Sequence, residues 1–508
     1  MKNWKDIFIG KMLDFVFGMF GVILCFLFLL SITETSKLNI EEIVSYHKDT
    51  PFFHILLFIT IFLFAANSKR QVHLKVLKSV LYGIFFLCMA AWIAVTQLYP
   101  KADQLQIMAI CPHIAEKNYQ DFYPGGYLYS QPHQIFLTYF CTALYILFGK
   151  SYVFVFQLLN CIAVLGIYNL LEKMYRRFEK KGSSKAFLIL SFLFLPLVFY
   201  VTFVYGTIIG LYFSLAAVEF LIRYMKKLRF RYLAACTACI VSAQLFKSNY
   251  LIFFVGILII LLIGFLKEKN FRHIVFIFIL IFSQMSANYC VKKITEDRTN
   301  IQSNGGVPKI LFVAMGLEEA RSGPGWWSGY HDNVYLRSGF DAEKSKETGK
   351  KKIEERIKKM RKNPRYAASF FLRKLASEWS EPTYESIWIQ QDRKSGTDIP
   401  ELIDRLIHNG GRLEKIYIFY CNIYQSFLYL GALLFVFTRF KKISDTELLI
   451  PIIFIGGFLF HTFWEAKGQY TLPYCVCLLP YSISGYRASF GRMNFSKCFR
   501  TVLNWELK

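Results

Sequence analysis

The sequence predicts an all-α polytopic membrane protein with about twelve transmembrane helices. Of its 508 residues 55% are hydrophobic and 18% aromatic, and the mean hydropathy is +0.35, which is more apolar surface than a soluble chain of this length buries. The apolar residues gather in runs near the length that crosses a bilayer. Many of the basic residues behind the net charge of +25 lie in short segments between these runs.

The apolar runs give the predicted spans, since about 20 apolar residues cross the hydrocarbon core and packed helices can be shorter. The first run, Met12 to Ser31, is too long for a signal peptide and lacks a small-residue cleavage site, so we expect it to stay as an anchor. In chain order the runs are about 12–31, 51–66, 79–98, 152–171, 186–203, 207–222, 233–246, 249–266, 273–290, 413–438, 447–463 and 468–486.

Basic residues between the runs predict an orientation. The segments "NSKRQVHLKVLK", "EKMYRRFEKKGSSK" and "RYMKKLRFR" are rich in lysine and arginine, which favour the cytoplasmic side. Both termini are then cytoplasmic, and the loops 32–50, 99–151 and 291–412 face outside. A bacterial plasma membrane is the expected location, because the outer insert has no cysteine and eukaryotic sorting signals are absent.

The apolar segment from His133 to Gly149 tests this orientation. If it crossed the membrane, the basic loop at 172–185 and every later loop would change sides. We therefore expect a juxtamembrane helix at the outer interface. The alternative is that this segment spans and another run does not.

The chain divides into three predicted parts. Residues 1–290 form an N-terminal membrane domain that contains the predicted catalytic outer loop 99–151. Residues 291–412 form a mainly helical extracytoplasmic insert, with two helices broken at Asn363-Pro364. Residues 413–508 form the C-terminal membrane helices and a basic cytoplasmic tail.

Several kinds of site find no support in the sequence. Cys236 and Cys239 form a CxxC pair, but they lie in a hydrophobic run where a redox or metal role lacks access. No Gly-rich phosphate loop, zinc spacing or Ser/His/Asp signature is present, so no metal site is predicted, and a requirement for a divalent ion stays open. Basic cytoplasmic loops account for the net charge, so no nucleic acid is expected as a partner.

Asp103 is the first candidate for chemistry, because it lies five residues past the apolar run Val80 to Leu98. A carboxylate at that depth is costly unless it is solvated or functional, and partial desolvation makes it a better base. The same loop holds Glu116 and Asp121, followed by Tyr123 in a turn with Pro124-Gly125-Gly126. The alternative is that Asp103 only marks the end of a span.

Four segments resemble a known family. They are "ADQ" after an early run, "YPGGYLYSQPHQIFLTYFCTALYILFGKSYVFVFQLLN", "AQLFKSNYLIFF" and "FWEAKGQYTLPY", which together cover roughly residues 80–486. They resemble the acidic motif, the proline-containing stretch with its juxtamembrane helix, the lysine-bearing turn and the late "E…RY.LP" stretch of GT-C membrane glycosyltransferases. Within this superfamily they resemble in particular relatives of the protein O-mannosyltransferases.

The resemblance implies a reaction. Such enzymes transfer a sugar, with inversion, from a polyprenyl-phosphate lipid to an acceptor on the outer face of the membrane. Asp103 would be the general base on the acceptor hydroxyl, with Glu116 or Asp121 as a second acid. Lys247 would steady the departing phosphate. Gln469 stands where the family has an arginine, and Lys467 is the candidate substitute, without the bidentate fork of arginine.

Further side chains are candidates for substrate binding, each with a structural alternative. Lys247 could simply snorkel to the interface, and Glu465 lies where an aromatic belt is expected anyway. His133 could be a solvated loop residue, and the tryptophans of "GPGWWSGYHDNVY" could be a packed loop edge. The "ASEWSEPTYESIW" segment has the same ambiguity. The substrate-binding candidates are Tyr123, His133, Lys247, Asn249, Trp326, Trp327, Glu465, Lys467 and Tyr470.

Three functions remain open at this stage. The favoured one is the glycosyltransferase, whose partners would be the lipid-linked sugar donor, membrane lipids and a glycan, lipid or protein acceptor. A transporter or flippase for a lipid-linked precursor should show internal pseudo-symmetry and charges near the midplane, and the sequence has acids at the outer rim and no repeat. A non-catalytic assembly protein of the same fold is the third reading, because of Gln469.

Overall fold

The computed structural model describes residues 4–39, 41–54, 73–96, 101–179, 184–302, 305–390, 401–407 and 411–490. Most of these residues are helical, and several helices have the length and apolar character of membrane spans. The protein is therefore an all-α membrane protein, as predicted. The sheet among the described residues is one antiparallel hairpin of β1 (Glu34–Leu38) and β2 (Val44–Lys48), with Glu34 opposite Lys48.

Seven stretches of the described residues are long and apolar enough to cross a membrane. They contain α1 (Trp4–Thr33), α3 (Leu74–Thr96), α6 (Ile135–Phe148) with α7 (Tyr152–Phe178), α10 (Thr207–Lys227), α12 (Leu251–Glu268), α13 (Phe271–Thr299) and α19 (Arg412–Arg439). An eighth would join α8 (Lys185–Phe192) to Pro196–Thr202 across a bend of 56°.

The remaining predicted spans are shorter or lie outside the described residues. The apolar helices α11 (Phe230–Phe246) and α20 (Leu449–Phe463) have 17 and 15 residues, and α21 (Leu472–Phe490) has Pro480 within it. The predicted span 51–66 falls largely outside the residues that the structure describes. A total of twelve spans thus stays a prediction.

The segment between α3 and α7 forms a set of short helices. It contains α4 (Asp103–Ala115), α5 (Tyr127–Ser130) and α6. The 14 residues of α6 reach about 21 Å at the α-helical rise, which is less than the roughly 30 Å of a hydrocarbon core. Gly149, with φ +56°, separates α6 from α7. One candidate span, Pro132–Phe178, includes both α6 and α7, and the juxtamembrane position of α6 stays a prediction.

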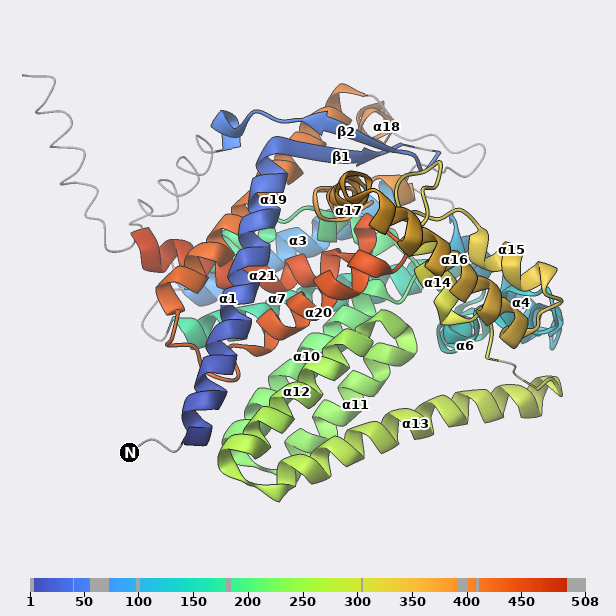
Figure 1. The fold of residues 1–508 in the computed structure, drawn as a ribbon, viewed down its shortest axis with the longest axis horizontal. Helices are drawn as coiled ribbons and strands as arrows, with labels where there is room; N and C mark the ends of the chain where they lie inside the picture. The colour runs from blue at the N-terminus through green and yellow to red at the C-terminus, as the bar shows by residue number, and fades with distance from the viewer. Residues whose placement is uncertain are drawn as a thin grey trace, which may run out of the picture.

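The helix core is packed around α19. Helices α1 and α21 both run along α19, and α10 runs along α11 (Figure 1). Gly485 of α21 approaches the backbone of α19 so closely that an added Cβ would lie 2.0 Å from the carbonyl oxygen of Gly431. Only a residue without a side chain allows this approach, which is typical of helix pairs in membranes.

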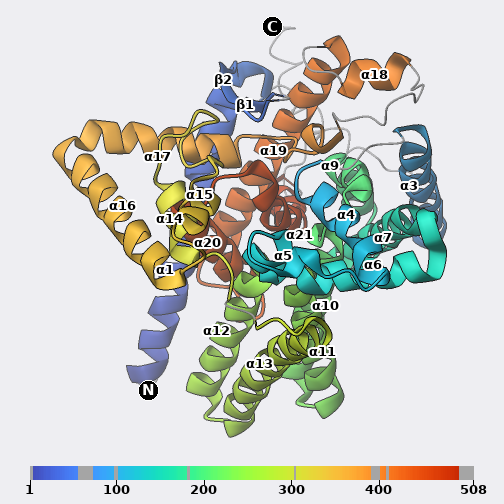
Figure 2. The ribbon, with the colours of Figure 1, turned by 90° about the vertical axis from the view of Figure 1, so that its right-hand side faces the viewer.

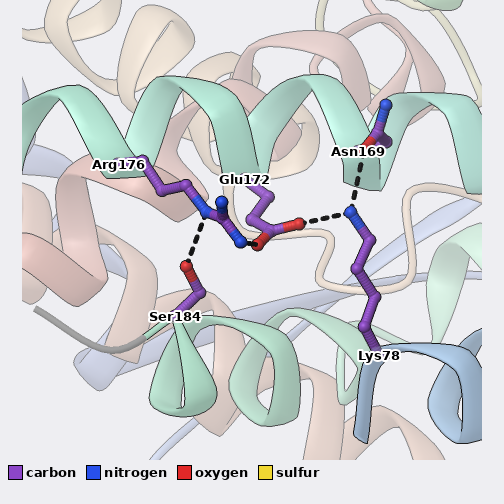
Figure 3. Close-up of polar contacts among 5 residues, drawn as sticks. All are labelled: Lys78, Asn169, Glu172, Arg176 and Ser184. Atoms are coloured by element: carbon purple, nitrogen blue, oxygen red, sulfur yellow. Dashed lines mark hydrogen bonds and ion pairs between the residues drawn. The ribbon is translucent and has the colours of Figure 1, made fainter. Parts of the chain in front are cut away.

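A buried carboxylate joins three helices away from this crossing. Glu172 of α7 is 2% exposed and accepts from Lys78 of α3 at 2.6 Å and from Arg176 (Figure 3). Lys78 also donates to Asn169 at 2.9 Å, and Arg176 Nε donates to Ser184 beside α8 at 3.0 Å. A buried charge is stable only when it is paired and hydrogen-bonded, so these contacts fix α3, α7 and α8 relative to one another.

The insert packs on the membrane helices. It contains α14 (Lys309–Gly316), α15 (Tyr330–Arg337), α16 (Ala342–Lys362) and α17 (Pro364–Trp379), and Figure 2 shows α14 and α15 between α16 and α5. Asn363 caps α17 by accepting from the N–H of Tyr366 at 3.0 Å, and α17 contacts α1, β1 and α20. The predicted domain boundary at 291 falls inside α13, which continues as one helix to Thr299.

Candidate functional site

The candidate site gathers around Asp103, the first residue of α4, whose side chain is exposed. The hydroxyl of Tyr205 donates a hydrogen bond to Asp103 Oδ2 at 3.2 Å, and Gln134 Nε2 donates to that hydroxyl in turn. The neighbouring Gln104 accepts from the backbone N–H of Val204 at 2.8 Å, which ties the beginning of α4 to the loop before α10. The carboxylate is therefore held in a defined direction while it stays accessible.

Two further tyrosines border this carboxylate. Tyr127 of α5 hydrogen-bonds to Asp103, and burial together with that carboxylate raises the pKa of Tyr127 well above its ordinary value. Its hydroxyl is therefore a permanent donor. Tyr470 lies in the short helix η7 (Gly468–Tyr470) and donates to Glu465 Oε2 at 3.3 Å. The tyrosine hydroxyls around Asp103 thus donate to carboxylates and fix their orientation.

Lys247 brings a cation to the same place. It follows the last residue of α11 and is only 9% exposed. Its Nζ donates to Thr207 Oγ1 at 2.8 Å and lies 4.7 Å from the ring centre of Tyr205 and 5.5 Å from that of Tyr470. Among the described residues no carboxylate lies within ion-pair distance of this ammonium. The contacts hold the lysine by a neutral hydroxyl and two rings, so its charge remains open to an anion.

The position of Lys247 depends on a close contact between two loops. An added Cβ on Gly206 would lie 1.9 Å from the carbonyl oxygen of Phe246, so only glycine lets the beginning of α10 meet the end of α11. The resulting burial lowers the pKa of Lys247 from its ordinary 10.5 to about 7, although the charges of Asp103 and Glu385 act in the opposite direction. A bound anion would therefore stabilise the protonated form strongly.

Lys467 is held differently. Its ammonium forms an ion pair with Glu42, from the turn between β1 and β2, and lies 5.5 Å from the ring centre of Trp388. Burial lowers the pKa of Lys467, but the carboxylates of Glu42, Glu465 and Glu385 outweigh burial and raise the pKa above the ordinary value. This lysine is charged and already neutralised by carboxylates.

Buried carboxyl groups surround Lys467. Burial raises the pKa of Glu465 and that of Glu385 to about 7, against the charge of Lys467. Glu385 Oε1 accepts from the backbone N–H of Gln469 at 3.3 Å. Glu378 is fully buried, and burial raises its pKa well above the ordinary value. These carboxyl groups lie behind Lys467, and the hydrogen bond from Gln469 to Glu385 positions η7.

A small pocket joins the lysine turn to η7. Lys247, Asn249, Gln469 and Tyr470 line it, with four apolar or aromatic side chains behind them: Tyr250, Phe253, Pro473 and Tyr474. Gln469 therefore lies beside Lys247. The position keeps a polar side chain, and the positive charge of this pocket comes from Lys247.

The structure does not bring Glu116 and Asp121 to Asp103. Glu116 follows the opposite end of α4, whose 13 residues extend about 20 Å, and it is exposed. Asp121 forms an ion pair with His113 at 3.2 Å at that same end. Tyr123 is 54% exposed in the turn that follows. These side chains are placed too far along the helix to share one reacting atom with Asp103.

The remaining predicted residues lie in different surroundings. His133 is exposed and close enough to Asp103 for that charge to act on it. Trp326 is fully buried, and its indole N–H donates to Ser377 at 2.7 Å, so it has no surface left for a ligand and serves packing. Trp327 is 45% exposed.

Sequence reasoning missed several members of the site. Tyr205 and Glu42 come from a loop and a hairpin turn that carry no motif. Glu378 and Glu385 belong to the aromatic segment that had been noted as ambiguous, and three acids within it are the signal that could have found them. Asp332 of α15, on which the charge of Asp103 acts, follows the tryptophan pair that drew attention instead.

A metal centre finds no geometric support in the described part of the chain. There, no group of three or more histidine, cysteine, aspartate or glutamate side chains is arranged to hold an ion.

Comparisons with known proteins add no relative. No family model matches the chain, and no curated protein matches it. The function proposed for this protein therefore rests on the geometry of the candidate site and on the resemblance of the four segments.

Proposed function

We propose that this protein is an inverting glycosyltransferase that moves a sugar from a polyprenyl-phosphate donor to a cell-envelope acceptor on the outer face of the membrane. One observation carries the proposal: an exposed, hydrogen-bonded carboxylate, Asp103, lies beside a buried lysine, Lys247, that has no carboxylate partner among the described residues. The two residues come from segments 144 positions apart in the chain (247 less 103).

Asp103 is the proposed general base. In an inverting transfer the acceptor oxygen attacks the anomeric carbon as the bond from that carbon to the donor phosphate breaks. The acceptor loses a proton in this step, and Asp103 takes it up. The hydroxyls of Tyr205 and Tyr127 hold the carboxylate, and its two oxygens together accept more than two hydrogen bonds, so it can also accept from the acceptor hydroxyl. A positioned base of this kind typically contributes 10²–10⁴-fold in rate, an order-of-magnitude range.

Lys247 is the proposed partner of the leaving phosphate. A prenyl phosphate gains a negative charge when its bond to the sugar breaks, and a desolvated cation stabilises such a charge more than a solvated one. The tyrosine rings and Thr207 hold the ammonium without neutralising it. Lys467 is less suited to this role, because Glu42 already pairs with it.

The membrane arrangement belongs to the same proposal. We infer twelve spans with both termini in the cytoplasm of a bacterial plasma membrane, which puts the loops 99–151 and 291–412, and with them Asp103, outside. The support is the set of basic segments at 67–78, 172–185 and 223–231, which fall on the other side. Cysteine labelling of Ala102→Cys with a membrane-impermeant maleimide on intact cells should succeed, and protection of that position would contradict the orientation.

Transfer assays test the activity directly. Membranes containing the protein are supplied with radiolabelled polyprenyl-phosphate mannose, glucose or galactose, and the label in glycan, lipid and protein fractions is measured. Transfer from at least one donor is expected, and Asp103→Asn should lower it at least about 100-fold. Asp297→Asn, an exposed carboxylate paired with Lys293, is the matched control and should retain full transfer.

The outcomes separate the proposed enzyme from its alternatives. No transfer from any donor would support a non-catalytic assembly protein of this fold, while movement of the donor across vesicle membranes without transfer would support a flippase. Full transfer by Asp103→Asn would remove the role of that residue.

A further inference from the structure

A second wall of the site comes from the insert. The backbone N–H of Val307 donates to the carbonyl of Ser130 at 2.9 Å, which joins the insert to the outer loop. After α15, the ring of Phe340 packs edge-on against Tyr129, with ring centres 5.8 Å apart. These contacts hold α15 against α5, and Figure 2 shows the two helices on the same face of the molecule. The beginning of α15 carries His331 and Asp332.

The polar groups of this wall are connected to one another. Asp332 Oδ2 lies 3.3 Å from His331 Nε2, and its carboxylate also hydrogen-bonds to Gln131. The side chain of Asp332 is 50% exposed, whereas that of His331 is 5% exposed. The charges of Asp103 and Asp332 both act on Tyr127, so this tyrosine lies close to both carboxylates. Asp103 and Asp332 are therefore two accessible acids with a tyrosine beside them.

The charge of this wall differs from that of the lysine pocket. Burial lowers the pKa of His331 to about 4, so the ring is neutral at neutral pH and leaves the charge of Asp332 uncompensated. Burial and the charge of Asp103 raise the pKa of Asp332 above its ordinary value, which reflects repulsion between the two carboxylates. An anion placed between them would add to that repulsion. A neutral group with hydroxyl donors would relieve it, because each carboxylate accepts several hydrogen bonds.

We propose that Asp332, His331, Gln131 and Tyr127 form an acceptor subsite that binds the hydroxyl groups of an uncharged sugar ring opposite Asp103. Asp332 accepts from neighbouring hydroxyls, and the amide of Gln131 keeps one N–H for the sugar beyond the one that it gives to Asp332. Tyr127, whose hydroxyl donates to Asp103, borders the ring, and His331 Nε2 lies 3.3 Å from Asp332 Oδ2 and orients that carboxylate. This inference rests on the proposed function, to which it adds the chemical class of the acceptor end.

In this proposal Asp332 is the second acid of the site. Glu116 and Asp121 lie at the far end of α4, and Asp332 is the carboxylate that faces Asp103 instead. We give Asp332 a binding role, because its contacts are with the side chains that would hold the acceptor. It orients the acceptor, while the proton goes to Asp103.

Binding of defined sugars tests the subsite without requiring turnover. The purified full chain in detergent micelles is titrated with methyl α-mannoside, methyl β-glucoside, methyl β-galactoside, and with glucuronate and mannose 6-phosphate as anionic probes. Saturation-transfer NMR reports binding. At least one neutral glycoside should bind, and the anionic probes should bind at least about ten times more weakly. Asp332→Asn should weaken the neutral glycoside about ten-fold or more, as expected for loss of a charged hydrogen-bond acceptor.

Two controls keep the test decisive. Asp297→Asn should bind like the wild type, and size-exclusion and thermal unfolding profiles confirm that Asp332→Asn is folded. The inference is overturned if no neutral glycoside binds, if anionic probes bind equally well, or if Asp332→Asn binds like the wild type. Neutral binding lost in Asp332→Asn, without transfer from any prenyl donor, would keep the subsite and end the proposed reaction instead.

Discussion

Replacement of Lys247 by methionine should stabilise the fold at neutral pH and abolish a pH dependence. Between about pH 7 and 10.5 the unfolded chain carries a proton on this amine that the folded chain has largely lost, so stability should rise with pH in that window. The shift from 10.5 to about 7 corresponds to a destabilisation of about 4 kcal/mol at pH 7. About 3 kcal/mol of this should disappear by about pH 9.5.

The contacts of the ammonium reduce the net gain. Methionine loses the hydrogen bond to Thr207 and the two ring contacts, each worth about 1 kcal/mol. The variant should therefore be more stable than the wild type by roughly 1 kcal/mol at pH 7 and less stable than it near pH 9.5. The change with pH in the stability difference between variant and wild type does not depend on the energies assigned to these contacts.

Reversible unfolding in mixed micelles measures this difference. Wild type and Lys247→Met are compared between pH 7 and 9.5, with Lys292→Met, an exposed lysine of α13, as the control that should show no such change. A stability difference that stays constant over this range would refute the buried, partly deprotonated state of Lys247. It would also remove the argument that a phosphate group meets an unneutralised cation there.

Three further predictions concern side chains elsewhere in the structure. Glu172→Ala should destabilise the fold by roughly 3 kcal/mol, because it leaves Lys78 and Arg176 without their carboxylate partner. Thermal unfolding in micelles measures this loss, and an unchanged unfolding midpoint would contradict the stabilising role of the Glu172 ion pairs. Trp326→Ala should cost roughly 3–5 kcal/mol, as truncation of a fully buried ring, and should lower the amount of folded protein rather than sugar affinity. Asp121→Asn should retain at least half of the wild-type transfer in the membrane assay, and a loss as large as that of Asp103→Asn would return this acid to the reaction.

Hydropathy predicted most of the helices because bilayer thickness determines their length. Helices α1, α7, α12, α13 and α19 lie where apolar runs were found. The hydropathy pattern did not predict where α13 ends. The last turns of this helix are polar, so the helix continues beyond its apolar run. Hydropathy also gives no means of choosing between a span and a short apolar helix such as α11.

The site was only partly accessible to sequence reasoning. Asp103 was predicted from its position five residues past an apolar run, and Lys247 and Tyr470 were predicted because their segments resemble motifs of a known family. Asp332 and Glu385 were not assigned, because a carboxylate becomes informative only when its burial and neighbours are known. Trp326 was predicted to bind substrate because a tryptophan beside glycines suggests an exposed side chain. In the structure Trp326 is fully buried.

The ion pair between Glu42 and Lys467 has a consequence for biosynthesis. The two residues are 425 positions apart, so at typical synthesis rates of 5–20 residues per second the hairpin that carries Glu42 emerges roughly 20–85 s before its lysine exists. During that interval the glutamate stays solvated, and the wall behind η7 has no counter-ion. A chain that ends before Lys467 therefore lacks the link between the β1–β2 turn and the C-terminal helices that this ion pair provides.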